Sequence, residues 1–122
     1  MIEDYGNLSP RVKSFVERFI DSFIAWDLAL FFRDNPYAVG SAESLAPSIG
    51  RRSSDLQLHM EKLAERGILC RESPPGDPGE PVYSYHPPED YSVDVEEFRN
   101  ALREREARLI IVSWVLRQEA GR

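Results

Sequence analysis

The stretch that decides the fold runs from residue 41 to residue 69 and reads SAESLAPSIGRRSSDLQLHMEKLAERGIL. Its first part predicts a short helix from Ser41 to Ile49, because Leu45 and its apolar neighbours recur at helical spacing behind a serine start signal. Gly50 supplies the stop, since glycine readily adopts the backbone conformation that ends a helix. A short helix followed by a tight glycine turn is therefore expected here.

A longer helix is expected to follow this turn. It begins just after Arg51 and Arg52, with Ser53 or Ser54 as its N-cap, and Gly67 ends it. The residues predicted to face the core recur at helical spacing and are Leu56, Met60, Leu63 and Ala64. Two helices joined by a glycine turn form a helix-turn-helix pattern.

Beyond this helix the sequence changes from a helical to a strand pattern. Residues 68–71 and 82–86 each fit a short strand, and residues 73–81 between them are dense in proline and glycine. These features predict a β-hairpin with a long polar tip. Pro87 and Pro88 then force the chain into an extended exit.

Long helical patterns flank this region on both sides. Residues 9–34 are expected to form one long bent helix or two consecutive helices, because the apolar face shifts near Ile24 to Trp26. The final helix is expected to run from about Ser92 to Glu119.

The final helix carries an apolar run, residues 109–116, that surrounds most of its circumference. This run is too short and too closely flanked by charges to span a bilayer, so protein must cover it. Both ends of the chain are rich in large apolar residues. We therefore expect a homodimer that is held together by the two terminal helices.

The order of these elements is that of a winged helix-turn-helix. The pairing of ESLA at residues 43–46 with LAERGIL at residues 63–69 resembles prokaryotic transcription regulators of the ArsR and MarR kinds. The resemblance covers about residues 26–86 and implies a mainly α fold with a small β-hairpin. One domain is expected, in which residues 1–25 form an N-terminal helix and residues 87–122 a C-terminal helix for dimerisation.

The resemblance implies a fold more strongly than a function. Together with the dimer expected from the terminal helices, it predicts a homodimeric, sequence-specific DNA-binding regulator whose recognition helix spans about residues 53–66. Arginines before this helix can clamp phosphates or reach guanine, and Ser and Gln side chains can hydrogen-bond base edges. An exposed leucine there can touch only a thymine methyl group. The candidate DNA-binding residues are Arg51, Arg52, Ser53, Ser54, Gln57 and Leu58.

The charge balance limits how the chain can bind DNA. With 15 Lys and Arg against 21 Asp and Glu, the net charge is -6, which excludes a broad cationic surface for non-specific binding to nucleic acid. Residues 41–71 hold five basic and four acidic side chains, so this segment is +1 and the remainder is -7. Any DNA contact is therefore expected to be local.

The expected hairpin departs from the basic wings that follow the minor groove. It carries Glu72, Asp77 and Glu80, and no basic residue lies between Glu72 and His86. This departure motivates a second hypothesis, a winged-helix adaptor that binds another protein and not DNA. Winged helices serve both purposes, since a fold does not fix a function.

Other chemistry finds little support in the sequence. The lone Cys70 excludes an internal disulfide and a cysteine-built zinc site, and its place in a predicted strand favours a buried, inert thiol. His59 and His86 are too isolated to predict a metal site. No nucleophile–base pair or phosphate-binding glycine loop occurs, so we expect neither catalysis nor a cofactor.

The two tryptophans allow two interpretations. Trp26 and Trp114 either belong to the core or line a ligand cavity between the terminal helices, and large aromatic residues at helical spacing favour the core.

No uncharged apolar stretch approaches the ~20 residues of a membrane helix, and the N-terminus lacks the pattern of a secretory signal. A cytoplasmic protein is expected.

Overall fold

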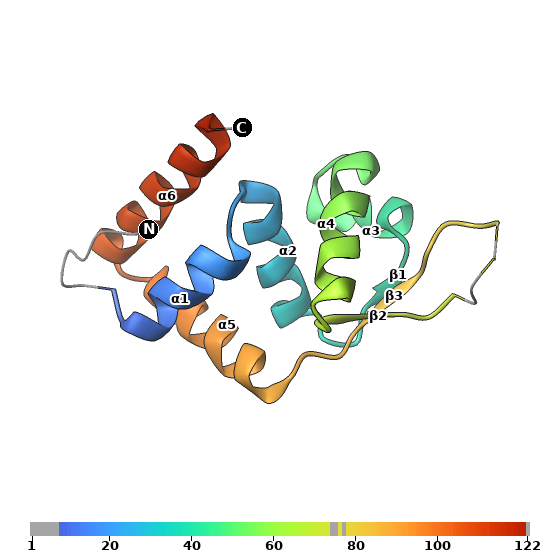
Figure 1. Cartoon of the computed structure of the whole chain (residues 1–122), viewed down its shortest axis with the longest axis horizontal. Helices are drawn as coiled ribbons and strands as arrows, with labels where there is room; N and C mark the ends of the chain where they lie inside the picture. The colour runs from blue at the N-terminus through green and yellow to red at the C-terminus, as the bar shows by residue number, and fades with distance from the viewer. Residues whose placement is uncertain (1–7, 74–75, 77, 122) are drawn as a thin grey trace.

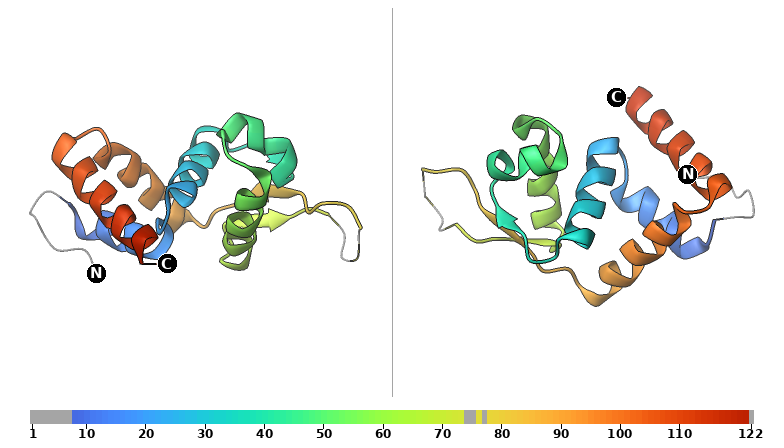
Figure 2. Two further views of the ribbon diagram at one scale, coloured as in Figure 1. Left: turned by 90° about the horizontal axis from the view of Figure 1, so that it is seen from above. Right: turned by 180° about the vertical axis from the view of Figure 1, so that it is seen from behind.

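A computed structural model of the chain describes residues 8–73, 76 and 78–121. Within these residues the fold is mainly helical, with a small antiparallel sheet (Figure 1). The elements are α1 (Pro10–Phe19), α2 (Phe23–Asp34), β1 (Val39–Gly40), α3 (Ala42–Ile49), α4 (Ser53–Glu65), β2 (Leu69–Arg71), β3 (Tyr83–Tyr85), α5 (Glu89–Ala101) and α6 (Arg105–Ala120). The molecule is elongated, with α6 at one end and the β2–β3 hairpin at the other (Figures 1 and 2).

The sheet has three strands in the order β1-β3-β2, all antiparallel. Its hairpin confirms the two predicted strands, and in its centre Ser84 lies between Val39 of β1 and Cys70 of β2. Strand β1 was not predicted, because two residues are too few to show an alternating pattern.

The N-terminal helical region consists of two consecutive helices, which is one of the two predicted alternatives. The predicted position of the break, near Ile24 to Trp26, is wrong by several residues. The break lies between Phe19 and Phe23. Ser22 is the N-cap of α2, since its Oγ accepts a hydrogen bond of 3.0 Å from the backbone N–H of Ala25. The break is therefore set by a cap and not by the later change of apolar face.

The prediction of one final helix from Ser92 to Glu119 is also wrong. Helix α5 begins three residues earlier, at Glu89, and a turn at residues 102–104 separates α5 from α6. A straight helix of that length would extend about 42 Å, longer than the core of a small domain. The turn buries Leu102 and lets both helices pack against the same core cluster.

Two clusters of buried side chains form the core, and α2 contributes to both. The first joins α1, α5 and α6 through residues such as Phe15 and Phe98, and the second joins α2, α3, α4 and the sheet through residues such as Phe32 and Leu56. Trp114 is buried in the first cluster and Trp26 packs against it, so both tryptophans belong to the core and not to a ligand cavity. None of the helices in the described residues combines the length and apolarity needed to cross a membrane.

A bidentate ion pair links α2 to α5 at the surface. Arg33 donates two hydrogen bonds of 2.8 Å, one from Nε and one from Nη2, to the carboxylate of Glu96. This contact holds the pKa of Glu96 below its ordinary value. It fastens the helix shared by both clusters to the first cluster.

Candidate nucleic-acid interface

Helices α3 and α4 are the two helices predicted on either side of Gly50. Ser41 and Ser44 close a capping box at the start of α3, with backbone-to-hydroxyl hydrogen bonds of 2.9 and 3.1 Å. Gly50 ends α3 with φ +80°, a left-handed conformation that side chains other than glycine adopt at a cost. The local signals at Ser41 and Gly50 therefore place this turn as predicted.

The start of α4 differs from the predicted serine cap. Arg52 occupies the N-cap position and its side chain makes no capping hydrogen bond, while Ser53 is the first helical residue. Ser53 is half-buried, and Ser54 is exposed. The predicted N-cap role of Ser53 or Ser54 is wrong, because the chain enters the helix one residue earlier.

The two arginines before α4 have acidic neighbours. Arg51 Nε lies 2.7 Å from Asp27 Oδ2 on α2, and Arg52 Nε lies 3.4 Å from Asp55 Oδ2 in the first turn of α4. The Arg52 side chain is 85% exposed, whereas that of Arg51 is 37% exposed. Arg52 is thus the more accessible cation at this helix end.

Gln57 is engaged within the protein. Its Nε2 donates hydrogen bonds to Glu61 Oε1, at 3.0 Å, and to the hydroxyl of Tyr83, at 3.1 Å. Tyr83 belongs to β3 and is fully buried. Gln57 therefore fastens α4 to the sheet, and reading an adenine edge would require its Nε2 to give up one of these two contacts.

The outward face of α4 changes character along its length. Ser54 and Leu58 are exposed on the first two turns, and the Leu58 side chain is 54% exposed. Glu61 and Glu65 are exposed further along the same face. The N-terminal half of α4 thus presents a hydroxyl and an apolar side chain beside two arginines, whereas the C-terminal half presents carboxylates.

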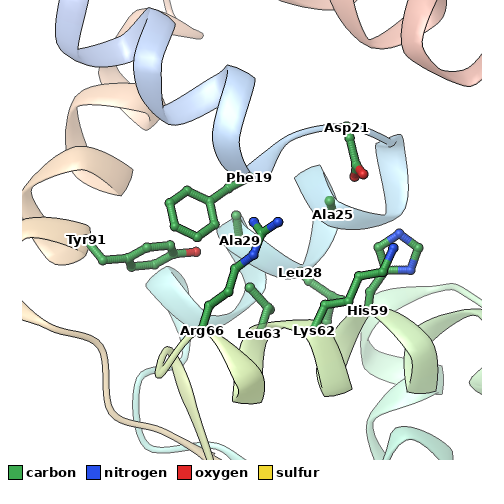
Figure 3. Close-up of a pocket in the computed structure, with 10 residues that line it drawn as sticks. All are labelled: Phe19, Asp21, Ala25, Leu28, Ala29, His59, Lys62, Leu63, Arg66 and Tyr91. Carbon is green, nitrogen blue, oxygen red and sulfur yellow. The ribbon is translucent and has the colours of Figure 1, made fainter.

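The basic side chains of α4 lie on its other edge, toward α1 and α2. His59, Lys62 and Arg66 line a small cavity there (Figure 3). Arg66 Nη1 donates a hydrogen bond to the carbonyl oxygen of Arg18, and its guanidinium lies 5.2 Å from the centre of the Phe19 ring. The cavity volume is about 30 Å³, which is room for only one or two water molecules.

His59 joins α4 to the break between α1 and α2. Its Nε2 lies 3.0 Å from the Oγ of Ser22, the N-cap of α2, and its Nδ1 lies 3.1 Å from the carbonyl oxygen of Asp55. Sequence reasoning missed this contact, although the spacing of His59, Lys62 and Arg66 places the three on one helix edge. His59 and Arg66 therefore support the packing of α4, and Lys62 lines the same cavity.

The hairpin is stabilised by its own polar contacts. The hydroxyl of Ser84 donates to Glu72 Oε1 at 3.0 Å, and the backbone N–H of Glu72 donates to the carbonyl oxygen of Val82 at 2.7 Å. Glu80 is exposed, whereas Asp77 lies outside the described residues. The described part of the hairpin beyond Arg71 offers carboxylates and no cation before His86.

Cys70 is exposed, so the prediction of a buried thiol is wrong. Alternation along β2 turns Leu69 into the core and Cys70 to the outer face of the sheet. Among the described residues, no three or more His, Cys, Asp or Glu side chains are placed to hold a metal ion.

Comparison with known proteins adds no further constraint. No family model, no curated protein and no solved structure matches the chain. The function is therefore inferred from the side chains of α3, α4 and the residues around them.

Proposed function

We propose that the protein is a winged-helix DNA-binding regulator in which the start of α4 enters the major groove. The observation that supports this most is the order α2-β1-α3-α4-β2-β3, with the sheet order β1-β3-β2, around an α4 whose N-terminal end is exposed and flanked by arginines. A helix-turn-helix contacts base edges mainly through the N-terminal residues of its second helix. Such a regulator works beside DNA in the cytoplasm.

Only the first two turns of α4 fit a DNA groove. Arg52 and Arg51 supply phosphate contacts there, and Ser54 and Leu58 reach the base edges. The backbone N–H groups at this helix start also favour a phosphate. Since Glu61 and carboxylates further along α4 repel phosphate, the helix must point into the groove with its N-terminus and not lie along it.

The test is a binding measurement on the full chain. A duplex is selected from a random-sequence pool by repeated rounds of binding, and its affinity is measured by fluorescence anisotropy at several salt concentrations. Replacing Arg51 and Arg52 with alanine should weaken binding at least about tenfold and lower the slope of log K against log salt by about 1.8 per protomer. The double variant Arg11→Ala with Arg103→Ala removes the same charge from exposed positions on α1 and in the turn before α6, and it should leave the slope unchanged.

A second control separates a DNA contact from loss of the Arg51–Asp27 ion pair. Asp27→Asn breaks the same pair but leaves the arginine in place. The proposal predicts that this variant binds DNA as tightly as the natural chain or more tightly. Weakening equal to that of the arginine variants would contradict it, as would a pool from which no duplex is enriched.

The acidic face of α4 favours a second candidate function, a winged-helix adaptor for another protein. Leu58 is exposed on this face, and Glu61 and Glu65 follow it. This combination suits a partner surface with a basic rim around an apolar pocket. Replacing both glutamates with lysine separates the candidates, because a DNA-binding helix gains affinity for DNA whereas an adaptor loses its protein partner.

A further inference from the structure

Helix α6 is apolar on two faces, and the chain covers only one of them. The inner face, with Ile111, Trp114 and Val115, is buried in the first core cluster. On the opposite face Leu109 is 51% exposed and Leu116 is 54% exposed. A helix that is apolar almost all round is normally covered on every side, so the outer face lacks an occupant within the chain.

We propose that this outer face binds a second copy of the chain, with the two α6 helices antiparallel. The sequence predicts a dimer held by both terminal helices, but the apolar face of α1, with Val12, Phe15 and Val16, is already buried within the chain. We therefore place only α6 in the dimer interface. Self-association through α6 is independent of DNA binding and can be measured without DNA.

The spacing along α6 allows one helix to pack on its copy. Leu109 and Leu116 are seven residues apart, which is about two helical turns, so they lie on one stripe. Ser113 is exposed between them and, together with Leu109, Leu116 and two flanking residues, lines a shallow groove. A small residue at the centre of the stripe lets two helix backbones approach closely, with Leu109 of each copy facing the partner's Leu116.

Charges on the two edges of this stripe fit a second copy of the same helix. At 100° per residue, Arg105 and Glu119 flank the stripe on one edge, and Glu106 and Arg117 flank it on the other. Antiparallel packing brings Arg105 close to the partner's Glu119, and Glu106 close to the partner's Arg117. Parallel packing would also pair unlike charges, because each edge would then face the opposite edge of the copy. It would, however, set like ends of the two helix dipoles side by side, whereas antiparallel packing sets unlike ends together.

Glu119 already has one contact within the chain. Its Oε2 accepts a hydrogen bond of 2.9 Å from the backbone N–H of Phe23, at the start of α2. A carboxylate has two oxygens with several acceptor sites, so the same group can also accept from an arginine. This contact also holds the C-terminal end of α6 in place against α2.

The apolar part of the proposal is tested by the mass of the full chain in solution without DNA, measured by light scattering at micromolar concentration. The natural chain should have twice the monomer mass of 14.0 kDa, and Leu109→Glu combined with Leu116→Glu should halve the measured mass. The control Val39→Glu combined with Val93→Glu places the same two charges at exposed apolar positions on β1 and α5, and it should remain dimeric. A natural chain that is monomeric, or a leucine variant that stays dimeric with native circular dichroism, would overturn the proposal.

The direction of packing is tested by charge reversal. Glu106→Arg should weaken the dimer at least about tenfold, because it sets two arginines together twice at the interface. Adding Arg117→Glu to the same chain should restore most of the lost affinity. A double variant as weak as the single variant would overturn the antiparallel arrangement, since only this arrangement joins these two positions across the interface.

Discussion

At the scale of single residues, Gly40 has no room for a side chain. A Cβ built on it would lie 2.5 Å from Ser44 Oγ and 3.1 Å from Leu45 Cγ. Because Ser44 also closes the capping box of α3, this contact would disturb the start of α3. Gly40→Ala should lower the free energy of unfolding in urea by about 1–3 kcal/mol.

The matched control for this substitution is Gly121→Ala. The nearest atoms to a Cβ there are backbone oxygens at 3.5 and 3.7 Å, an ordinary contact distance. The free energy of unfolding of the Gly121→Ala variant should differ from that of the natural chain by no more than about 0.5 kcal/mol. Equal effects of the two substitutions would contradict the role assigned to the space around Gly40.

The buried tyrosines make stability depend on alkaline pH. Burial raises the pKa of Tyr85 from 10.0 to about 12, and it raises the pKa of Tyr91 as well. Because the folded state favours the neutral phenol, this contribution to stability is complete below pH 10 and is lost as the pH rises toward about 12. Urea unfolding from pH 8 upward should show Tyr85→Phe losing less stability above pH 10 than the natural chain. Identical pH dependence would contradict this.

Residue identities alone could not give the partners of the candidate site. The sequence singles out Arg51 and Gln57 as polar groups near a helix start, and the structure places both near that start. Asp27 and Tyr83 lie 24 and 26 residues away from them in the chain, so only the packing of α2 and β3 against α4 reveals the contacts. Exposure of Ser54 and Leu58, by contrast, follows from helical spacing and could be predicted.

At the scale of elements, the junction between α1 and α2 depends on Ser22. This residue is fully buried, caps α2 and contacts His59 of α4, so one hydroxyl serves two elements. Ser22→Ala should lower the free energy of unfolding by about 2 kcal/mol, because it removes a cap and leaves a partly buried histidine nitrogen without its partner.

The matched control is Ser9→Ala at the N-cap of α1. Ser9 is exposed, and its Oγ accepts one hydrogen bond of 3.2 Å from the backbone N–H of Val12. Its replacement should cost about 1 kcal/mol or less in urea unfolding. A loss at Ser9 as large as that at Ser22 would contradict the double role of the buried serine.

Local signals account for the elements that were predicted well. The helix behind Ser41, its end at Gly50 and the two strands of the hairpin each carry a cap, a glycine or an alternation that acts within a few residues. No cap, glycine or alternation marks the turn at residues 102–104. This turn depends on the burial of Leu102 in a core that α5 and α6 share, which local sequence does not show. Ser22 could have been predicted as an N-cap from its residue type. The apolar pattern continues across it, however, and so gave no sign of a helix break at this position.

At the scale of the whole molecule, the two proposed surfaces lie apart. Helix α6 occupies the end opposite the hairpin, with α2 and α4 between them in Figure 1. Variants in the outer face of α6 are therefore expected to change the mass in solution while leaving the α4 surface intact. A net charge of -6 also fits this arrangement, since only a small part of the surface has to face phosphate.

DNA binding by the start of α4 is tested most directly by the backbone amide spectrum of the isotope-labelled chain, titrated with the selected duplex. DNA binding through the start of α4 should give the largest shifts at residues 51–58, with smaller shifts in the hairpin strands β2 and β3 and none in α6. Shifts confined to α6, or a bound complex in which residues 51–58 keep their free positions, would contradict a DNA contact by the start of α4.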